Sequence, residues 1–345
     1  MQSIYGITRK KLEEYFINIG EKKFKATQIY EWIYRQGVKS FDEMSNIRKE
    51  TIIKLKEDFY FNELQIIQKE EDKLVKKYLF QLNDNNKVEA VLMEHDYGLS
   101  LCISSQIGCN MGCAFCESGR LKKVRNLTVD EMVLEVMGVE KDINKRISHI
   151  VIMGIGEPFD NYDNFIDFIK IINDPYSLAI GQRHITVSTC GIVPKIREFA
   201  DEETGVNLAI SLHAPNNELR SKIMKINNAY KIEEIIDAVK YYISKTNRRV
   251  TFEYIMLKDV NDSKTCAYEL SNLLKGINAY VNLIPYNETE NIEFKRSSTS
   301  QIGAFYDILK KNNINVTIRK EFGTKVSAAC GQLRARADAL KEKGV

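Results

Sequence analysis

Strand-like and helix-like segments alternate from residue 98 to near the C-terminus, and this alternation constrains the fold more than any other feature of the chain. The expected strands are Leu99–Ser104, His149–Met153, His184–Ser188, Asn207–Ser211, Val250–Met256, Tyr280–Pro285 and Asn315–Arg319. The expected helices between them include Thr128–Val139, Tyr162–Ile172, Ile232–Ser244 and Ser300–Lys311. Alternation of this kind predicts an α/β fold with a parallel sheet, either doubly wound or curved into a full or partial barrel.

The segments outside this region follow other patterns. Residues 1 to about 60 carry apolar side chains at helical spacing, as in Ala26, Ile29 and Ile33, and predict a small helical module. From Leu64 to about Met93, strand-like runs separated by a turn predict a hairpin or small sheet. We therefore expect a helical accessory domain over 1–62, a β-hairpin linker over 63–97, a barrel over 98–322 and a C-terminal segment over 323–345.

Composition narrows the class of protein. A chain of 345 residues with 44% hydrophobic residues can bury a large core and a smaller accessory one. A net charge of +3 permits an RNA partner without requiring one. No apolar stretch approaches the roughly 20 residues needed to span a bilayer, and the N-terminal residues are too charged for a signal peptide, so we expect a soluble cytoplasmic protein. Seven cysteines, three of them close together, suit thiolate chemistry in a reducing compartment.

A CxxxCxxC motif, formed by Cys109, Cys113 and Cys116, follows the first expected strand of the barrel. Three thiolates can hold a 4Fe–4S cluster and leave its fourth iron open. Gly108 and Gly112 allow backbone conformations close to the metal that a Cβ atom would obstruct. A zinc site is the alternative, although structural zinc usually takes four protein ligands and the chain has no second CxxC-type pair.

A CxxxCxxC loop at this place in a parallel β/α array resembles the radical S-adenosylmethionine (SAM) superfamily. The resemblance implies a partial (β/α)6 barrel, a cluster-bound methionine moiety and a 5′-deoxyadenosyl radical. Glu157, after a glycine turn, could then accept a hydrogen bond from the ammonium group of SAM. Ser188, Ser211 and Asn287 also follow expected strands, where barrel enzymes carry their sites, although each alone is more often a turn or cap residue.

Five motifs make the resemblance more specific. They are CISSQIGC at 102–109, MGIGEP at 153–158, SLHAP at 211–215, LIPYN at 283–287 and AACGQL at 328–333. Together they closely resemble the RlmN/Cfr family of RNA methyltransferases. The resemblance implies SAM binding by Gly156, Glu157, Ser188, Ser211, Leu212, His213 and Asn287, with the cluster on Cys109, Cys113 and Cys116. It also implies that Cys330 carries a methyl group, that Cys102 forms a transient disulfide with Cys330, and that Glu89 accepts a proton.

The chemistry of adenine methylation explains why Cys102 and Cys330 would be required in addition to the cluster ligands. The amidine carbons of adenine are electrophilic and cannot take a methyl cation, whereas the thiolate of Cys330 can take one from a first SAM. A radical derived from a second SAM would remove hydrogen from that methyl group, and the carbon radical would add to the base. Cys102 would release the product by forming a disulfide after Glu89 accepts the ring proton. The alternative for Cys330 and Cys102 is a buried structural thiol, which is also our interpretation of Cys190 and Cys266.

The motifs are more similar to the RlmN branch, which methylates C2 of adenine in 23S rRNA and tRNA. The Cfr branch methylates C8 of adenine in 23S rRNA and confers antibiotic resistance. Departures from the usual RlmN pattern at Glu117–Gly119, Cys190 and Asn287–Glu288 leave C2 and C8 open. A radical enzyme for a small molecule or protein and a zinc-stabilised RNA-binding protein are further alternatives.

An electron donor such as flavodoxin or ferredoxin and an RNA substrate are the partners implied. Phosphates could be contacted by Lys122–Arg125, Arg248, Arg249, Arg334 and Arg336. The aromatic residues Tyr30, Trp32 and Tyr34 could grip RNA or form the core of the helical module. The target base is expected to leave its stack.

Overall fold

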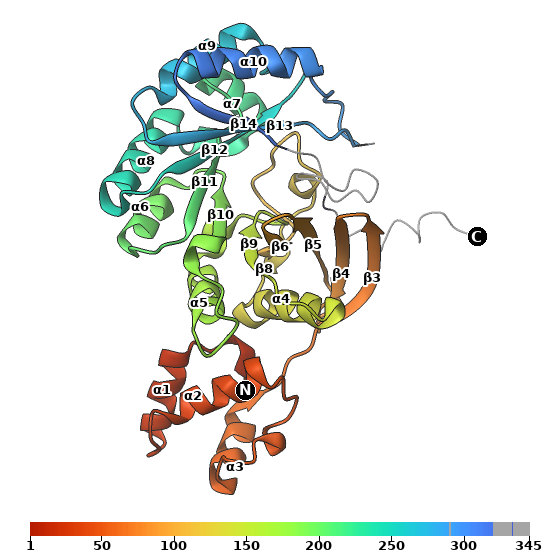
Figure 1. Ribbon diagram of the computed structural model, residues 1–345, viewed down its shortest axis with the longest axis vertical. Coiled ribbons are helices and arrows are strands. Elements are labelled where there is room, and N and C mark those ends of the chain that lie inside the picture. Colours follow the sequence, from red (N-terminus) through yellow and green to blue (C-terminus); the bar gives the residue numbers. More distant parts are fainter. Residues whose placement is uncertain (290, 320–332, 334–345) are drawn as a thin grey trace, which may run out of the picture.

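The computed structural model describes residues 1–289, 291–319 and 333, and its main element is a curved ten-stranded sheet (Figure 1). Seven neighbouring strands are parallel: β6 (Gly98–Ile103), β9 (His149–Ile152), β10 (Ile185–Thr189), β11 (Asn207–Ser211), β12 (Val250–Met256), β13 (Ala279–Pro285) and β14 (Asn315–Ile318). All seven strands predicted from the sequence are therefore confirmed.

Helices follow the parallel strands and lie along the outer side of the sheet (Figure 1). They are α4 (Val129–Ile143), α5 (Tyr162–Asn173), α6 (Val193–Asp201), α7 (Asn217–Ile223), α8 (Ile232–Thr246), α9 (Lys264–Leu274) and α10 (Thr299–Lys311). Alternate strand residues such as Leu101, Ile150 and Ile152 pack against this helical layer in one continuous core. Because the other residues of each strand point to the opposite face, the concave side of the sheet remains for polar groups.

Three antiparallel strands extend the same sheet beyond β6. They are β3 (Gln65–Asp72), β4 (Val75–Gln81) and β5 (Lys87–His95), and β5 pairs with β6 over five residue pairs. The region predicted as a separate hairpin linker is thus continuous with the barrel sheet, because β5 pairs with the first parallel strand. In the β5–β6 register Val91 lies opposite Cys102, which puts Glu89, Val91 and Cys102 on one face.

The N-terminal module contains α1 (Arg9–Asn18), α2 (Lys25–Tyr30), α3 (Lys49–Asp58) and a parallel pair of short strands, β1 (Gln2–Ser3) and β2 (Phe59–Tyr60). Its core includes Tyr30, whose hydroxyl group donates to the Ile7 carbonyl at 2.7 Å. The Tyr34 hydroxyl group similarly donates to the Tyr5 carbonyl at 3.1 Å. Tyr30 and Tyr34, two of the three aromatic residues that could have gripped RNA, therefore serve the packing of this module.

A short antiparallel pair, β7 (Gln106–Ile107) and β8 (Arg125–Asn126), brackets the cysteine loop at the end of β6. Among residues 1–289 and 291–319, no helix combines the length and apolar character needed to cross a membrane. The predicted C-terminal run with Cys330, Arg334 and Arg336 lies outside the described residues, apart from Leu333.

Candidate active site

A cavity lies at the carboxyl ends of the parallel strands and gathers most of the predicted site residues. Eight of them line it: Cys109, Cys113, Cys116, Gly156, Glu157, Ser188, Ser211 and His213. They come from the last residues of β10 and β11 and from the loops after β6, β9 and β11, and these four strands are adjacent in the sheet order. The rule that parallel strands end at one edge therefore brought together side chains that are up to about a hundred positions apart.

The cysteine loop is held by tight backbone contacts. Gly108 has a φ of +73°, and a Cβ atom there would lie 2.2 Å from the carbonyl oxygen of Lys122. The Cys109 amide donates to the Leu121 carbonyl at 3.0 Å, which closes the loop at its base. The Ala114 amide donates to the carbonyl of Ile223, the last residue of α7, at 2.9 Å. The loop is therefore held by backbone hydrogen bonds at both its base and its tip.

The three thiols fit a cluster better than a single ion. In the part of the chain that the structure describes, no three His, Cys, Asp or Glu side chains converge on a single-ion site. A cubane cluster is held at separate corners, so its ligands need only line one cavity, as Cys109, Cys113 and Cys116 do. Burial raises the pKa of Cys109 to about 12, so metal binding there must displace a proton.

Glu157 is held by backbone groups on both sides of its carboxylate. Its Oε1 accepts from the Phe159 amide at 3.0 Å and its Oε2 from the Cys190 amide at 2.7 Å. The side chain is 3% exposed, and this burial raises its pKa. The preceding Gly156 has a φ of +110° and a Cβ atom there would lie 2.7 Å from Ser105, so the turn requires glycine. The carboxylate is thus held in one orientation at the cavity wall.

His213 offers a fixed hydrogen-bond donor. Its Nδ1 accepts from the Ile255 amide at 3.1 Å, so the neutral ring carries its proton on Nε2. Burial and the nearby Arg220 lower the pKa of His213 to about 3, so the ring is neutral at physiological pH. The residue has a φ of +58°, a strained backbone that Asn261 supports by donating to the His213 carbonyl at 2.8 Å. The motif thus orients one neutral imidazole at the cavity wall.

Two serine hydroxyl groups lie beside each other on neighbouring strands. The Oγ atoms of Ser188 and Ser211 are 3.2 Å apart, at the ends of β10 and β11. Leu212, the next residue, has its side chain in the apolar core. Asn287 is half-buried two residues beyond β13, and neither it nor Leu212 is part of the cavity wall in the described structure.

Glu89 and Cys102 lie on the concave face but outside this cavity. The Glu89 Oε1 atom is 3.1 Å from the Lys77 ammonium group, and the carboxylate is 1% exposed. Cys102 packs with Val91, Ile155 and Leu333 in a small apolar cluster. Leu333 also lines the main cavity, so it lies between the two groups of residues.

Sequence reasoning missed two buried charges of the site. Arg220 lies on α7 and is fully buried, and Glu253 on β12 is 5% exposed and lines the cavity. Glu253 accepts from the Asn282 side chain at 2.9 Å, and burial raises its pKa. Glu253 could have been predicted as a site residue, because it is a charged residue within the apolar strand 250–256. Arg220 could not, because its position in the sequence resembles that of any charged residue on an amphipathic helix.

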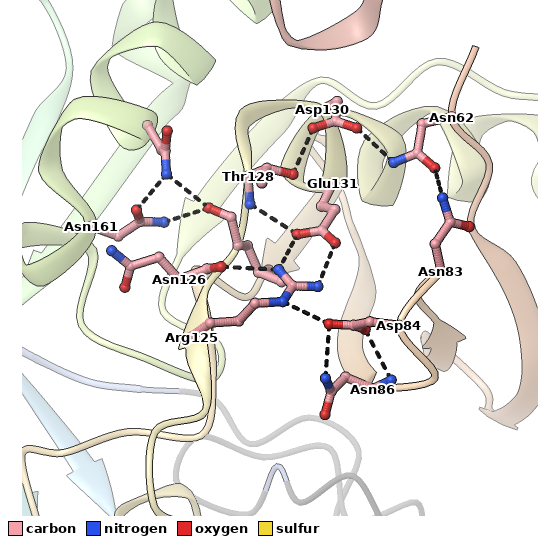
Figure 2. Close-up of polar contacts among 12 residues, drawn as sticks. Asn62, Asn83, Asp84, Asn86, Arg125, Asn126, Thr128, Asp130, Glu131 and Asn161 are labelled. Atoms are coloured by element: carbon pink, nitrogen blue, oxygen red, sulfur yellow. Dashed lines mark hydrogen bonds and ion pairs between the residues drawn. The ribbon is translucent and has the colours of Figure 1, made fainter. Parts of the chain in front are cut away.

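The basic patch after the cysteine loop has acidic partners (Figure 2). Figure 2 shows Arg125, which donates to both oxygens of Glu131 at 2.7 Å and to Asp84 at 2.7 Å. Elsewhere in the patch, Lys123 pairs with Asp160 at 2.7 Å. These contacts connect β8, the turn after β4 and the first turn of α4. Arg125 and Lys123 therefore have structural roles, which weakens their prediction as phosphate contacts.

The two other predicted basic contacts are also engaged. Arg248 donates to the Asn207 side chain at 2.6 Å. The guanidinium group of Arg249 lies 4.5 Å from the centre of the Tyr280 ring. Both lie near the amino ends of the parallel strands, away from the cavity, which does not favour them as contacts to a base in the site.

Comparisons with known proteins agree with this geometry. Residues 103–267 match the model of the Radical SAM superfamily, and residues 2–60 match that of the ribosomal RNA large subunit methyltransferase N-terminal domain. The chain is 55% identical to the probable dual-specificity RNA methyltransferase RlmN of Listeria welshimeri, over 99% of this chain and 95% of the relative. The chain belongs to the RlmN family.

Other members of the RlmN family and a solved structure extend this finding. The relative from Enterococcus faecalis is 55% identical over 97% of this chain and 96% of its own. The crystal structure of a radical SAM methyltransferase from Sphaerobacter thermophilus matches with a TM-score of 0.90 and 38% identity, over 97% of this chain and all of that one. The predicted partial barrel is thus confirmed, and the relatives favour RlmN over Cfr. Radical SAM proteins use SAM and a 4Fe–4S cluster, which the cysteine loop and Glu157 fit.

Proposed function

We propose that this protein is a radical SAM methyltransferase that methylates C2 of adenine in 23S rRNA and tRNA, in the cytoplasm, through a methyl-cysteine intermediate. The observation that carries the proposal is the cavity in which three cysteines of the CxxxCxxC loop meet Glu157 and His213. Membership of the RlmN family supports the RNA substrate and the C2 position. We also propose the domain limits predicted from the sequence, namely 1–62, 63–97, 98–322 and 323–345.

The chain's own residues would bind and orient the cofactors. When bound, the cluster and two SAM molecules per turnover would supply a methyl group and a 5′-deoxyadenosyl radical, with electrons from flavodoxin or ferredoxin. Cys109, Cys113 and Cys116 would hold the cluster. The Glu157 carboxylate would accept from the ammonium group of SAM, and the Nε2 proton of His213 would be donated to a SAM oxygen or nitrogen atom. Gly156, Ser188, Ser211, Leu212 and Asn287 would complete the SAM site.

Three residues outside the proposed SAM site would carry out the methyl transfer. Cys330 would hold the methyl group. Once the unpaired electron of the RNA adduct had returned to the cluster, Cys102 would attack the Cys330 sulfur, so that an S–S bond forms as the S–C bond to the RNA breaks. The released carbon would keep the electron pair and take a proton to become the methyl group. Glu89 would accept the proton from the ring carbon. A base must be ionised to accept a proton, and the Lys77 ammonium group 3.1 Å away stabilises that form. Leu333, three residues after Cys330, packs with Cys102, which supports the pairing of the two cysteines.

Mass spectrometry of nucleosides tests this function. We expect 2-methyladenosine in rRNA and tRNA incubated with the anaerobically reconstituted protein, SAM and a reducing system. Cys330→Ala should abolish the product, and Cys102→Ala should trap protein crosslinked to RNA. Cys266→Ala, a buried thiol on α9 away from the cavity, is the matched control and should retain activity. The proposal is wrong if 8-methyladenosine forms instead, and the two-cysteine scheme is wrong if Cys102→Ala turns over normally.

A further inference from the structure

Arg220 is a buried guanidinium group beneath the cavity whose partners are all neutral. It donates to the carbonyl oxygens of Leu212 at 3.1 Å, Cys190 at 2.6 Å and Ser211 at 3.3 Å, and to the amide oxygen of Asn227 at 3.2 Å. In the described structure no carboxylate forms an ion pair with it. The side chain is 0% exposed.

An uncompensated buried charge is costly, even when its hydrogen bonds are made. Burial lowers the pKa of Arg220 to about 10, so the group still carries its charge at neutral pH. An amide side chain could donate to some of the same carbonyl oxygens without this cost. The retained positive charge therefore suggests a negative partner that only the loaded site contains.

The position of Arg220 indicates where that partner lies. Cys190 and Ser211, which accept from Arg220, line the cavity. The helix that carries Arg220 ends at Ile223, whose carbonyl accepts from Ala114 inside the cysteine loop. The guanidinium group is thus a buried cation beside the cavity, on the helix whose last residue holds the cysteine loop.

A 4Fe–4S cluster with three thiolate ligands is net negative, and reduction by one electron makes it more negative still. A fixed positive charge favours the more negative state, and the reduction potential of such a cluster depends on nearby charge and hydrogen bonds. We propose that Arg220 stabilises the reduced form of the cluster and so raises its reduction potential. This inference rests on the cluster of the proposed function, and it assigns Arg220 as a residue that acts through the cluster.

Two substitutions remove the net charge in different ways. Arg220→Met deletes the cation. Asn227→Asp places an isosteric carboxylate against the guanidinium group, so the charge is neutralised while the hydrogen bond to Arg220 remains. Arg220→Lys keeps the charge and loses most of the hydrogen bonds. Lys222→Met, on the same helix with a side chain 62% exposed, is the matched control for loss of a positive charge.

The measurement is the midpoint potential of the reconstituted full-length proteins, from a redox titration followed by electron paramagnetic resonance without RNA. At the wild-type midpoint we expect the ratio of reduced to oxidised cluster to fall about tenfold in Arg220→Met and Asn227→Asp. For a one-electron couple a tenfold change is 59 mV. Arg220→Lys and Lys222→Met should remain close to the wild type.

The outcomes separate an electrostatic role from a structural one. If Arg220 only ties carbonyl oxygens together, Arg220→Lys and Arg220→Met will lose thermal stability while the midpoint stays unchanged, which overturns the inference. If Arg220→Met does not fold, an unchanged midpoint in Asn227→Asp overturns it equally. A wild-type protein that binds no iron would instead overturn the proposed function.

Discussion

Replacing Glu157 by glutamine is expected to do more than remove a charge. The two carboxylate oxygens each accept a backbone N–H, from Phe159 at 3.0 Å and from Cys190 at 2.7 Å. Glutamine has one acceptor oxygen, so in either orientation its NH₂ group faces one of these donors. The side chain is 3% exposed, so water cannot easily replace the lost partner. A buried donor left without a partner costs about 1–3 kcal/mol.

The cost of Glu157→Gln depends on pH in a direction set by burial. Burial raises the pKa of Glu157 in the folded protein above its usual 4.5. A carboxyl group whose pKa is higher in the folded state stabilises the fold fully below its pKa in the unfolded state. This stabilisation is lost as the pH rises through its pKa in the folded state. The glutamine variant does not titrate at this position. The stability difference between wild type and variant should therefore be largest near pH 4 and smaller at pH 8.

Two assays follow from this reasoning. Urea unfolding of the cluster-free proteins should show a loss of about 1–3 kcal/mol for Glu157→Gln, larger at the lower pH. Equilibrium binding of SAM to the reconstituted proteins should be about tenfold weaker, because a charge-assisted hydrogen bond becomes a neutral one. Glu218→Gln, whose side chain is 81% exposed, is the control and should change neither. Unchanged unfolding would contradict the two-acceptor geometry, and unchanged SAM binding would contradict the role in the cofactor site.

Three further substitutions have effects that the structure defines. Arg125→Met should cost about 2 kcal/mol in urea unfolding at pH 7. Arg125 lowers the pKa of Asp84 from 3.8 to about 2. A carboxyl group with a lowered pKa stabilises the fold above its unfolded-state pKa, and this stabilisation is lost as pH falls through the folded-state pKa. The part of the cost of Arg125→Met that comes from Asp84 should therefore disappear between pH 3.8 and about pH 2. Glu135→Gln should be near neutral at pH 5 and stabilising at pH 8, because burial raises the pKa of this fully buried carboxyl. Gly108→Ala should abolish cluster binding, measured as iron content, because its Cβ atom would lie 2.2 Å from the Lys122 carbonyl.

Each of these expectations has a contrary result. A cost of Arg125→Met that is equal at pH 7 and pH 2 would show that Asp84 has no part in the network. A Glu135→Gln variant that loses stability at pH 8 would show that the carboxylate is compensated in the fold. Full iron content in Gly108→Ala would show that the loop can relax around a side chain.

The parallel strands and the cavity could be predicted because their signals are local. Each strand is a short apolar run, and the rule that sites lie at the carboxyl ends of strands needs no knowledge of the register. As predicted, one cavity is lined by Cys109, Glu157, Ser188 and His213. The motif resemblance added the roles of these residues, which spacing alone does not specify.

The features that escaped prediction depend on partners distant in the sequence. The antiparallel strands join the barrel through the pairing of β5 with β6, which a local hairpin pattern does not specify. Arg125 looked like a phosphate contact because Asp84 lies 41 positions away. Arg220 received no prediction, because its acceptors on Leu212, Cys190 and Asn227 come from three separate segments of the chain.

The antiparallel extension gives the proposed reaction its spatial order. Cluster ligands and the Glu157 carboxylate lie at the strand ends, whereas Cys102 lies further back on the same concave face, next to β5. Leu333 contacts both regions, and its carbonyl accepts from the Ser118 hydroxyl group at 2.9 Å, directly after the cysteine loop. In the proposed reaction Cys102 would act only at product release, so it need not line the cavity that holds the three loop cysteines. The added strands supply Val75, Val91 and Met93, which pack in one cluster with Cys102 and Leu333.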